Sequence, residues 1–268
     1  MLRKMLLPTI LLPLAFSPVV AVTAPAAPAT LSAADIIARD IEAKGGLEAW
    51  RAVKTLSFSG KMDAGGKQHT QLPFVLEMKR PRKKRVEIEF ENEKAIQVYD
   101  GAKGWKLRPY LGRRDVEPFS AEELRAVSME SDLDGPLVDY ASKGIRVDLD
   151  GTDKVEGRDA YKLTLTLKDG TVRHLWVDAQ SFLELKIEGV PRRMDGKMHP
   201  VEINYRDYRR VNGLMIPYVL ETTVLGVNHS AHKMTVESVL VNATLDDVLF
   251  TPPKPAPVVA AKTNHKPG

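Results

Sequence analysis

The chain has 268 residues and contains no cysteine. This absence excludes a disulfide framework, and it also excludes the lipid-modified N-terminal cysteine that anchors lipoproteins. We therefore expect a mature protein that is soluble and is not tethered to a membrane by acyl chains of its own.

An excess of charge of one sign is missing as well. The formal net charge is +4, although 28% of the residues are charged, and both signs are spread along the sequence. Proteins that bind nucleic acid concentrate basic charge in a patch or stripe. The composition therefore argues against a nucleic-acid partner.

Long apolar runs are scarce outside the N-terminus. There, Arg3 and Lys4 precede an apolar run shorter than the roughly 20 residues of a membrane-spanning helix, and small residues follow it. The pattern is typical of a secretory signal peptide, which we place at 1–24, and it fits a membrane anchor less well. Pro25 disfavours the middle one of three candidate cleavage sites, which follow Ala21, Ala24 and Ala29.

Composition also suggests the remaining boundaries. An Ala/Pro-rich segment at 25–31 is expected to be a flexible leader. All-β folds commonly organise a chain of this length as one domain, which we place at 32–253. The tail at 254–268 is rich in Pro, Ala and Lys, and we expect it to be disordered.

Recognisable catalytic and metal-binding motifs are lacking. Nucleophile-elbow, P-loop and dinucleotide-binding patterns do not occur. His229 and His232 lie three residues apart without an acidic ligand beside them, whereas a catalytic zinc site uses three protein ligands. The segment 148–157 has its glycine at the fourth position, not at the sixth position of a calcium loop. We predict no catalytic residues, no metal site and no cofactor, and expect that the protein is not an enzyme.

Two alternating strands around an Arg-Pro turn are the most informative feature that is present. Phe74, Leu76 and Met78 share one face of the first strand, and the same parity places Arg80 on that apolar face. Such a face must be covered by helices, or by a ligand together with helices. The second strand alternates in the same way, with Val86, Ile88 and Phe90 between Glu87, Glu89 and Glu91.

Period-two alternation continues through much of the chain, and Asp-Gly or Asn-Gly turns separate several of the strands. Strands joined by two-residue turns are antiparallel neighbours, so we predict a meander of about eleven strands. Besides the two strands above and one that begins at Thr55, the predicted strands are 95–99, 105–109, 145–150, 161–168, 171–177, 183–188, 201–208, 214–227 and 233–241.

Helices are predicted where caps precede an apolar periodicity. One lies between the cap at Ser32 and Gly45-Gly46, and a shorter one follows at 47–53. Another begins at the Ser120 capping box, and a last one is expected at 136–144. These helices could cover the apolar face of the sheet.

Three segments carry a resemblance to a known family. They read "KRPRKKRVEIEF" from Lys79, "IQVYDGAKGW" from Ile96 and "LFTPP" from Leu249. This sequence resembles the LolA/LolB-like lipoprotein carriers, also called outer membrane lipoprotein-sorting proteins. The resemblance implies a mainly β fold, an unclosed antiparallel half-barrel with helices capping its concave face, and an apolar cavity for the acyl chains of a lipoprotein or lipid.

Arg80 is the residue for which the resemblance implies a role. A guanidinium buried without a partner is costly, so its inward parity requires oxygen atoms above the apolar face. Carbonyl groups at the C-terminal ends of the covering helices could supply them. The resemblance implies that Arg80 locks the lid until cargo enters. The alternative is a side chain that extends to the sheet edge.

Arg80 belongs to a basic cluster with two interpretations. The cluster could meet anionic lipid head groups or an acidic partner. It could equally be a solvated turn that protects a corner of the sheet, which the sequence favours. Its members are Lys79, Arg80, Arg82, Lys83, Lys84 and Arg85.

We therefore predict a periplasmic protein that binds acyl chains and moves them between membranes. An acyl chain of about fifteen methylenes gains on the order of 12 kcal/mol when it leaves water, so partial burial would suffice for binding. The expected ligand-binding residues comprise a floor of strand residues and four residues of the lid: Phe58, Phe74, Leu76, Met78, Val86, Ile88, Phe90, Ile96, Val98, Trp105, Leu124, Val127, Leu137 and Tyr140.

The expected partners are a lipoprotein or lipid cargo, an inner-membrane donor protein and an outer-membrane acceptor protein, with transient membrane contact. Two other functions stay open at this point. One is a periplasmic sensor or regulatory module that binds lipoproteins or lipids and signals through a protein partner. The other is a structural envelope protein whose core is filled.

Overall fold

A computed structural model describes residues 31–63, 70–227 and 231–255. The predicted signal peptide at 1–24 and His229 lie outside the described residues, as do most of the predicted leader and most of the predicted tail. The described residues belong to one unit that begins at Leu31.

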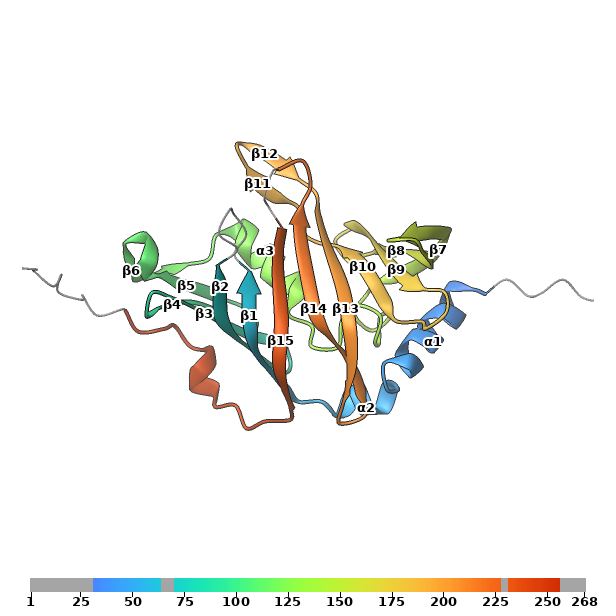
Figure 1. The fold of residues 1–268 in the computed structure, drawn as a ribbon, viewed down its shortest axis with the longest axis horizontal. Coiled ribbons are helices and arrows are strands. Elements are labelled where there is room, and N and C mark those ends of the chain that lie inside the picture. Colours follow the sequence, from blue (N-terminus) through green and yellow to red (C-terminus); the bar gives the residue numbers. More distant parts are fainter. Residues whose placement is uncertain (1–30, 64–69, 228–230, 256–268) are drawn as a thin grey trace, which may run out of the picture. The chain divides into compact units, whose positions relative to one another are not determined.

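Thirteen antiparallel strands form one sheet that does not close (Figure 1). The prediction of an unclosed, mainly β half-barrel is confirmed, with thirteen strands in place of about eleven. In spatial order the strands are β6 (Arg113–Pro118), β5 (Gly104–Arg108), β4 (Glu93–Tyr99), β3 (Lys83–Phe90), β2 (Gln71–Lys79), β1 (Thr55–Asp63), β15 (Ala231–Val241), β14 (Leu214–Val224), β13 (Val201–Val211), β10 (Glu184–Glu188), β9 (Val172–Asp178), β8 (Arg158–Thr166) and β7 (Arg146–Val155).

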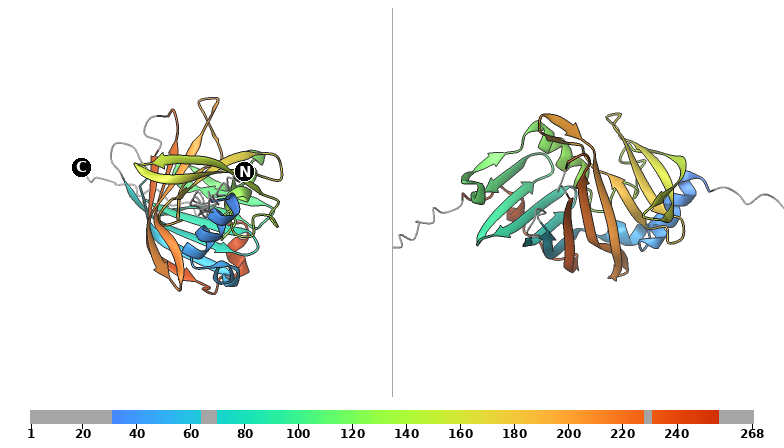
Figure 2. Two further views of the ribbon diagram at one scale, coloured as in Figure 1. Left: turned by 90° about the vertical axis from the view of Figure 1, so that its right-hand side faces the viewer. Right: turned by 45° about the horizontal axis from the view of Figure 1, so that its top comes forward.

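Each half of the sheet is a meander, and the first and last strands in the sequence, β1 and β15, join the halves at the centre of the sheet. β1 pairs with β15 in a register that runs from Leu56 opposite Val241 to Asp63 opposite Lys233. A bulge between Ser59 and Gly60 interrupts this register. The edge strands β6 and β7, which follow each other in sequence, therefore lie at opposite ends of the sheet (Figure 2).

The chain crosses the sheet between β6 and β7, and this crossover contains α3 (Ala121–Glu130) and a series of turns over 133–144. It passes behind the central strands in Figure 1. The predicted capping box is confirmed, since the Ser120 hydroxyl accepts a hydrogen bond from the Glu123 amide at 3.2 Å. The predicted helix at 136–144 is wrong. Asp139 has a left-handed φ of 52°, which interrupts helical geometry in the middle of the segment.

Two further helices precede the sheet, α1 (Ala33–Ala43) and α2 (Leu47–Ala52). Both were predicted, and the Ser32 cap of α1 is present. Gly45, just after α1, has a φ of 117°, and a Cβ atom there would lie 2.6 Å from the Gly213 carbonyl oxygen. Only glycine permits this close approach, which docks the end of α1 on the turn between β13 and β14.

A small hairpin, β11 (Arg192–Met194) and β12 (Lys197–His199), projects between β10 and β13. Its Asp195-Gly196 turn was predicted, whereas its strands and β6 were not. These strands escape sequence patterning because they are short and mostly polar, so they lack an apolar alternation.

The core lies mainly on the concave side of the sheet. Trp50 of α2 packs in a cluster with Leu56, Phe74 and Leu214. Ile36 and Ile37 of α1 pack in a second cluster, whose other buried members are Leu137, Leu163, Leu165, Leu175, Val177 and Ile187. The helices therefore fill part of the concave side and leave the space between them to the site described next.

Candidate functional site

A hollow of about 770 Å³ lies over the concave face of the sheet. Both halves of the sheet contribute apolar side chains to it, and Trp50 and Leu133 contribute from the covering segments. Four predicted ligand-binding residues line this hollow: Phe58, Phe74, Leu76 and Met78. Apolar lining residues that the prediction missed include Leu165, Ile187, Ile203, Leu220, Met234 and Val236.

Val86, Ile88 and Phe90 lie on the same side of β3 as their predicted partners on β2. Ile88 pairs with Phe74, and Val86 pairs with Leu76. Phe90, farther along the strand, makes an edge-to-face contact with Tyr110 at 5.9 Å. None of these three predicted residues is among the residues that line the hollow in the described structure.

The predicted positions of Ile96, Val98 and Trp105 need correction, because these residues lie on the opposite face of the sheet. Val86 pairs with Gln97, so the neighbours of Gln97 in β4 point away from the hollow. Val98 pairs in turn with Trp105 of β5. The three residues pack instead beneath the segment that follows β15, in a cluster with Leu245, Leu249 and Phe250.

The four predicted lid residues have different environments. Leu124 and Val127 are half-buried on α3, which has no fully buried side chain. Leu137 is fully buried, and Tyr140 packs against the same α1 cluster. None of the four lines the hollow, and the crossover instead contributes Met129 and Leu133.

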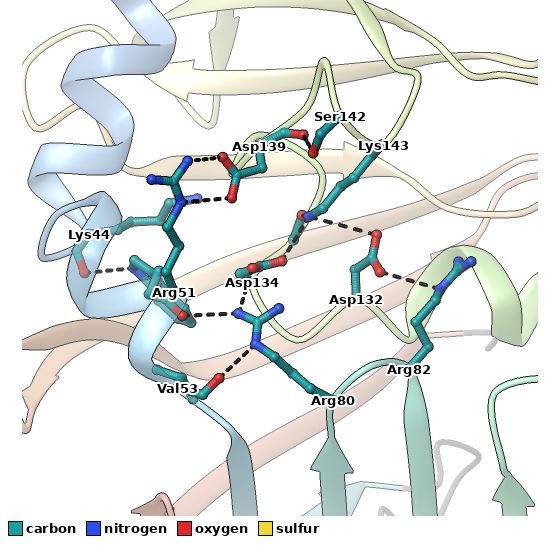
Figure 3. A network of polar contacts seen from close by, with 12 residues as sticks. Lys44, Arg51, Val53, Arg80, Arg82, Asp132, Asp134, Asp139, Ser142 and Lys143 are labelled. Carbon is teal, nitrogen blue, oxygen red and sulfur yellow. Dashed lines mark hydrogen bonds and ion pairs between the residues drawn. The ribbon is translucent and has the colours of Figure 1, made fainter.

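Arg80 points inward and binds the oxygen atoms that its parity requires (Figure 3). Its Nε donates to the Val53 carbonyl at 2.7 Å, and its Nη2 donates to the Trp50 carbonyl at 3.0 Å. Both carbonyls lie at the C-terminal end of α2, and the Trp50 carbonyl also accepts a hydrogen bond from the Val53 amide. The same Nη2 donates to Asp134 of the crossover at 2.7 Å. Arg80 thus joins the sheet, α2 and the crossover.

Asp134 is the centre of this contact, with only 4% of its side chain exposed. Its second oxygen accepts a hydrogen bond from Lys143 at 2.7 Å. Nearby, Arg51 of α2 makes a two-point contact with Asp139, at 3.0 Å and 2.6 Å (Figure 3). Sequence reasoning missed Asp134 as a partner because it lies 54 residues away from Arg80.

The basic cluster around Arg80 divides between the two faces of the sheet by parity. On the hollow side, Arg82 contacts Asp132, and Lys84 lies 3.6 Å from Glu130. On the other side, the odd-numbered members bind the segment after β15, with Lys79 and Lys83 on Asp247 and Arg85 on the Leu249 carbonyl. The cluster is therefore not simply a solvated turn, because it fastens a segment to each face.

Ion pairs join α3 to both halves of the sheet. Lys106 of β5 donates to Glu123 at 2.6 Å, and Arg125 donates to Asp169 in the turn between β8 and β9 at 2.9 Å. The Arg125 and Asp169 side chains are 61% and 51% exposed. An exposed pair such as Arg125–Asp169 contributes about 0.2–1 kcal/mol. Since α3 also has no fully buried side chain, it is held less firmly than the packed core.

Part of the lining of the hollow is polar. Lys44 is buried and lies 2.9 Å from Asp40 and 2.6 Å from Glu184. Burial, together with the nearby charge of Glu184, raises the pKa of Asp40 to about 7, and the attraction of Lys44 offsets only part of this rise. Tyr208 donates to the Glu184 carbonyl at 3.0 Å. The Asp40–Lys44 spacing was visible in the sequence, but Glu184 lies 140 residues away from Lys44.

Groups that could hold a metal ion are absent from the described residues: nowhere do three His, Asp or Glu side chains converge suitably. Within the same described ranges, no helix combines the length and apolarity needed to cross a bilayer.

Comparison with known proteins gives a fold likeness only. No protein-family model and no curated protein matches the sequence. A LolA superfamily protein from Nitrosomonas europaea superposes with a TM-score of 0.56 at 15% identity, covering 83% of this chain and 98% of that one. An outer membrane lipoprotein-sorting protein domain from Vibrio parahaemolyticus gives 0.53 at 14% identity, covering 80% and 94%.

A DUF1329 family protein from Desulfovibrio piger gives a TM-score of 0.52 at 12% identity, and the match covers 82% of this chain and 97% of that one. All three structures match nearly their whole length, so the likeness extends over the sheet and the segments that cover it. The chain therefore has the LolA-like fold.

Proposed function

We propose that this protein is a periplasmic carrier that binds the acyl chains of a lipoprotein or lipid in the hollow and moves them between membranes. The observation that carries the proposal is the unfilled volume of about 770 Å³ over an apolar floor. Pockets that bind small molecules commonly measure about 300–1,000 Å³. The fold shared with a lipoprotein-sorting domain supports the same class of cargo.

The lining chemistry suits a hydrocarbon chain. Phe74 and Met78 are buried at the floor, and Leu76 and Leu220 lie half-buried beside the hollow. Each methylene transferred from water to such a surface contributes about 0.8 kcal/mol. A carrier needs only part of a long chain to be buried, and incomplete burial keeps release feasible.

Release of the cargo requires a cover that can be displaced at a free-energy cost comparable to the free energy gained by burying the acyl chain. The crossover is fastened to the sheet by polar contacts of Arg80, Lys106 and Arg125. Polar contacts exchange with water more readily than packed apolar surface does, because water satisfies the separated groups. We infer that α3 and the following turns act as the lid, with Arg80 as its lock. No step of this function requires bond chemistry, so we regard the protein as a binding protein and not an enzyme.

The test is to fill the hollow. Leu220→Trp places a larger side chain in the hollow, and we expect the mature variant to lose at least about tenfold in affinity for a fluorescent fatty acid, since several methylenes lose their contact surface. The matched control is Leu240→Trp on the neighbouring strand, where the side chain is 57% exposed. Equal fatty-acid binding by both variants, with no lipid in solvent extracts of the wild-type protein, would refute the carrier proposal.

The sensor alternative is separated by a second measurement on the same preparations. A carrier passes a labelled acyl chain from donor to acceptor vesicles. Uptake without net transfer, together with a stable complex with a membrane-anchored regulator, would favour the sensor.

A further inference from the structure

Arg173 of β9 is a buried arginine that the carrier scheme above does not use. It is 8% exposed and lines the hollow, where it sits beside Leu165 of β8 in the register of the two strands. Its Nε donates to the Glu188 carbonyl at 2.6 Å. Burial lowers the pKa of Arg173, which reflects how poorly its charge is solvated.

The guanidinium has no carboxylate partner within the described residues. The Glu188 carboxylate accepts a hydrogen bond from the His174 amide at 2.9 Å and lies 2.8 Å from the His174 Nδ1. Glu130, the other nearby acid, lies 3.6 Å from Lys84. The two Nη groups of Arg173 have no hydrogen-bond partner in the described part of the chain, yet neither is sealed from the hollow. A buried charge without a counter-ion is costly, so an anion is expected there.

Other groups around the hollow support an anion. Tyr205 lies close enough to Arg173 to interact electrostatically with it, and its hydroxyl has no partner among the described residues. Lys168 and Arg192 are exposed lining residues without an ion pair in the described ranges. The acidic lining residues are, in contrast, engaged by cations of the protein: Glu130 by Lys84, Asp132 by Arg82, Asp134 by Arg80 and Lys143, Asp169 by Arg125, and Glu184 by Lys44.

We propose that Arg173 and Tyr205 form an oxyanion site inside the hollow, with Lys168 and Arg192 where it reaches the surface, so that the preferred ligand is an acyl chain that carries a carboxylate or phosphate group. This inference rests on the proposed carrier function. A guanidinium binds such groups through two parallel hydrogen bonds, which selects for charge and geometry together. The hydrocarbon would then lie against Ile187, Ile203 and Leu220.

The test compares ligands that differ only in the head group. Hexadecanoate, hexadecyl phosphate and neutral hexadecanol compete against the uncharged probe N-phenyl-1-naphthylamine on the mature protein. We expect the anionic ligands to bind about tenfold to hundredfold more tightly than hexadecanol, as charge-assisted hydrogen bonds would give. The anion that binds more tightly shows whether the preferred head group is a carboxylate or a phosphate.

Substitutions test whether the preference for anionic ligands arises at the proposed site. Arg173→Gln should reduce the preference for anions to about twofold or less while hexadecanol affinity stays unchanged, and Arg173→Lys should retain part of it. Tyr205→Phe gives an independent, smaller reduction if Arg173→Gln folds poorly. Arg146→Gln, with a side chain that is 74% exposed on β7, is the control and should keep the full preference.

Different results would refute the carrier function and the oxyanion site. If no ligand displaces the probe and the probe itself does not bind, the carrier function fails. Equal binding of hexadecanol and hexadecanoate, or a preference that survives both Arg173→Gln and Tyr205→Phe, overturns the oxyanion site alone. Binding of inorganic phosphate as tightly as hexadecyl phosphate also overturns it, because the acyl chain would then contribute nothing.

Discussion

At the scale of single residues, Arg80 shows how one inward-facing charge can hold three segments together. Its partners are two α2 carbonyls and Asp134 of the crossover. If the crossover moved away, Arg80 would keep the two carbonyls, whereas the buried Asp134 would keep only Lys143. The contact therefore stabilises the covered state more than it stabilises the sheet.

Replacing Arg80 by leucine should destabilise the protein by about 1–3 kcal/mol, less than for a fully buried pair because the Arg80 side chain is 34% exposed. Transfer of a fluorescent fatty acid to vesicles should become faster, since the lid loses its fastening. Urea unfolding and stopped-flow transfer measure the two effects. Arg146→Leu is the exposed control, and an unchanged transfer rate in Arg80→Leu would remove the lock role.

The Asp40 carboxyl predicts a pH dependence of stability. Because burial raises its pKa from 3.8 to about 7, the folded protein takes up a proton between about pH 4 and pH 7 that the unfolded chain does not. Its contribution to stability is therefore present at low pH and is lost as the pH rises through 7. Lys44, Glu184 and Tyr208 face the same carboxyl and are kept unchanged.

Urea unfolding at about pH 5.5 and about pH 8, which lie on either side of the pKa of about 7, tests this. Asp40→Asn cannot titrate, so its stability should change less between the two conditions than that of the wild type. The opposite result, an equal or larger dependence in Asp40→Asn, would place the titration on another group.

At the scale of elements, α3 and the segment after β15 cover opposite faces of the sheet in different ways. α3 has no fully buried side chain and is held by ion pairs. The other segment buries Phe250 against Val98. Packed apolar contact resists separation more than exposed ion pairs do, so we expect motion at α3 and not at the C-terminal segment.

Cross-linking α3 to the sheet should block ligand exchange. The chain has no native cysteine, so Arg125→Cys with Asp169→Cys gives a unique pair for a reversible bis-thiosulfonate linker. Fatty-acid uptake should slow at least about tenfold when the linker is present, because the exchange step then requires local unfolding, and it should recover on reduction. The control pair Lys154→Cys and Asp159→Cys lies within the β7–β8 hairpin. Rapid uptake by the linked α3 variant would show that the lid lies elsewhere.

Phe250→Ala should act on stability alone. The side chain is 2% exposed on the face opposite the hollow, so its loss should cost about 3–5 kcal/mol. Fatty-acid affinity, measured at a temperature where the variant is folded, should stay unchanged. Phe74→Ala is the matched variant that lines the hollow, and it should reduce both stability and affinity. Weakened binding by Phe250→Ala would show that the two faces are coupled.

At the scale of the whole molecule, the hollow exists because one open sheet curves around it. Its first and last strands in the sequence, β1 and β15, pair at its centre, while the edge strands β6 and β7 stay apart. The pairing of β1 with β15 brings Phe58 and Met234 to one surface although they lie 176 positions apart in the sequence. The crossover from β6 to β7 must then span the concave face to reach the other edge. The cover and the hollow are consequences of the same topology.

The sequence by itself determined the local features: the caps of α1 and α3, the turn residues, the inward parity of Phe74, Leu76, Met78 and Arg80, and the mainly β class. These depend on chemistry within a few residues, where alternation and capping leave few choices. Tertiary structure alone decided that Ile96 and Val98 face away from the hollow, since strand pairing, not alternation, selects which apolar stripe is inside. It also gathered Arg173, Tyr205 and Lys44 from separate segments, because a polar group is buried only where distant strands and helices meet.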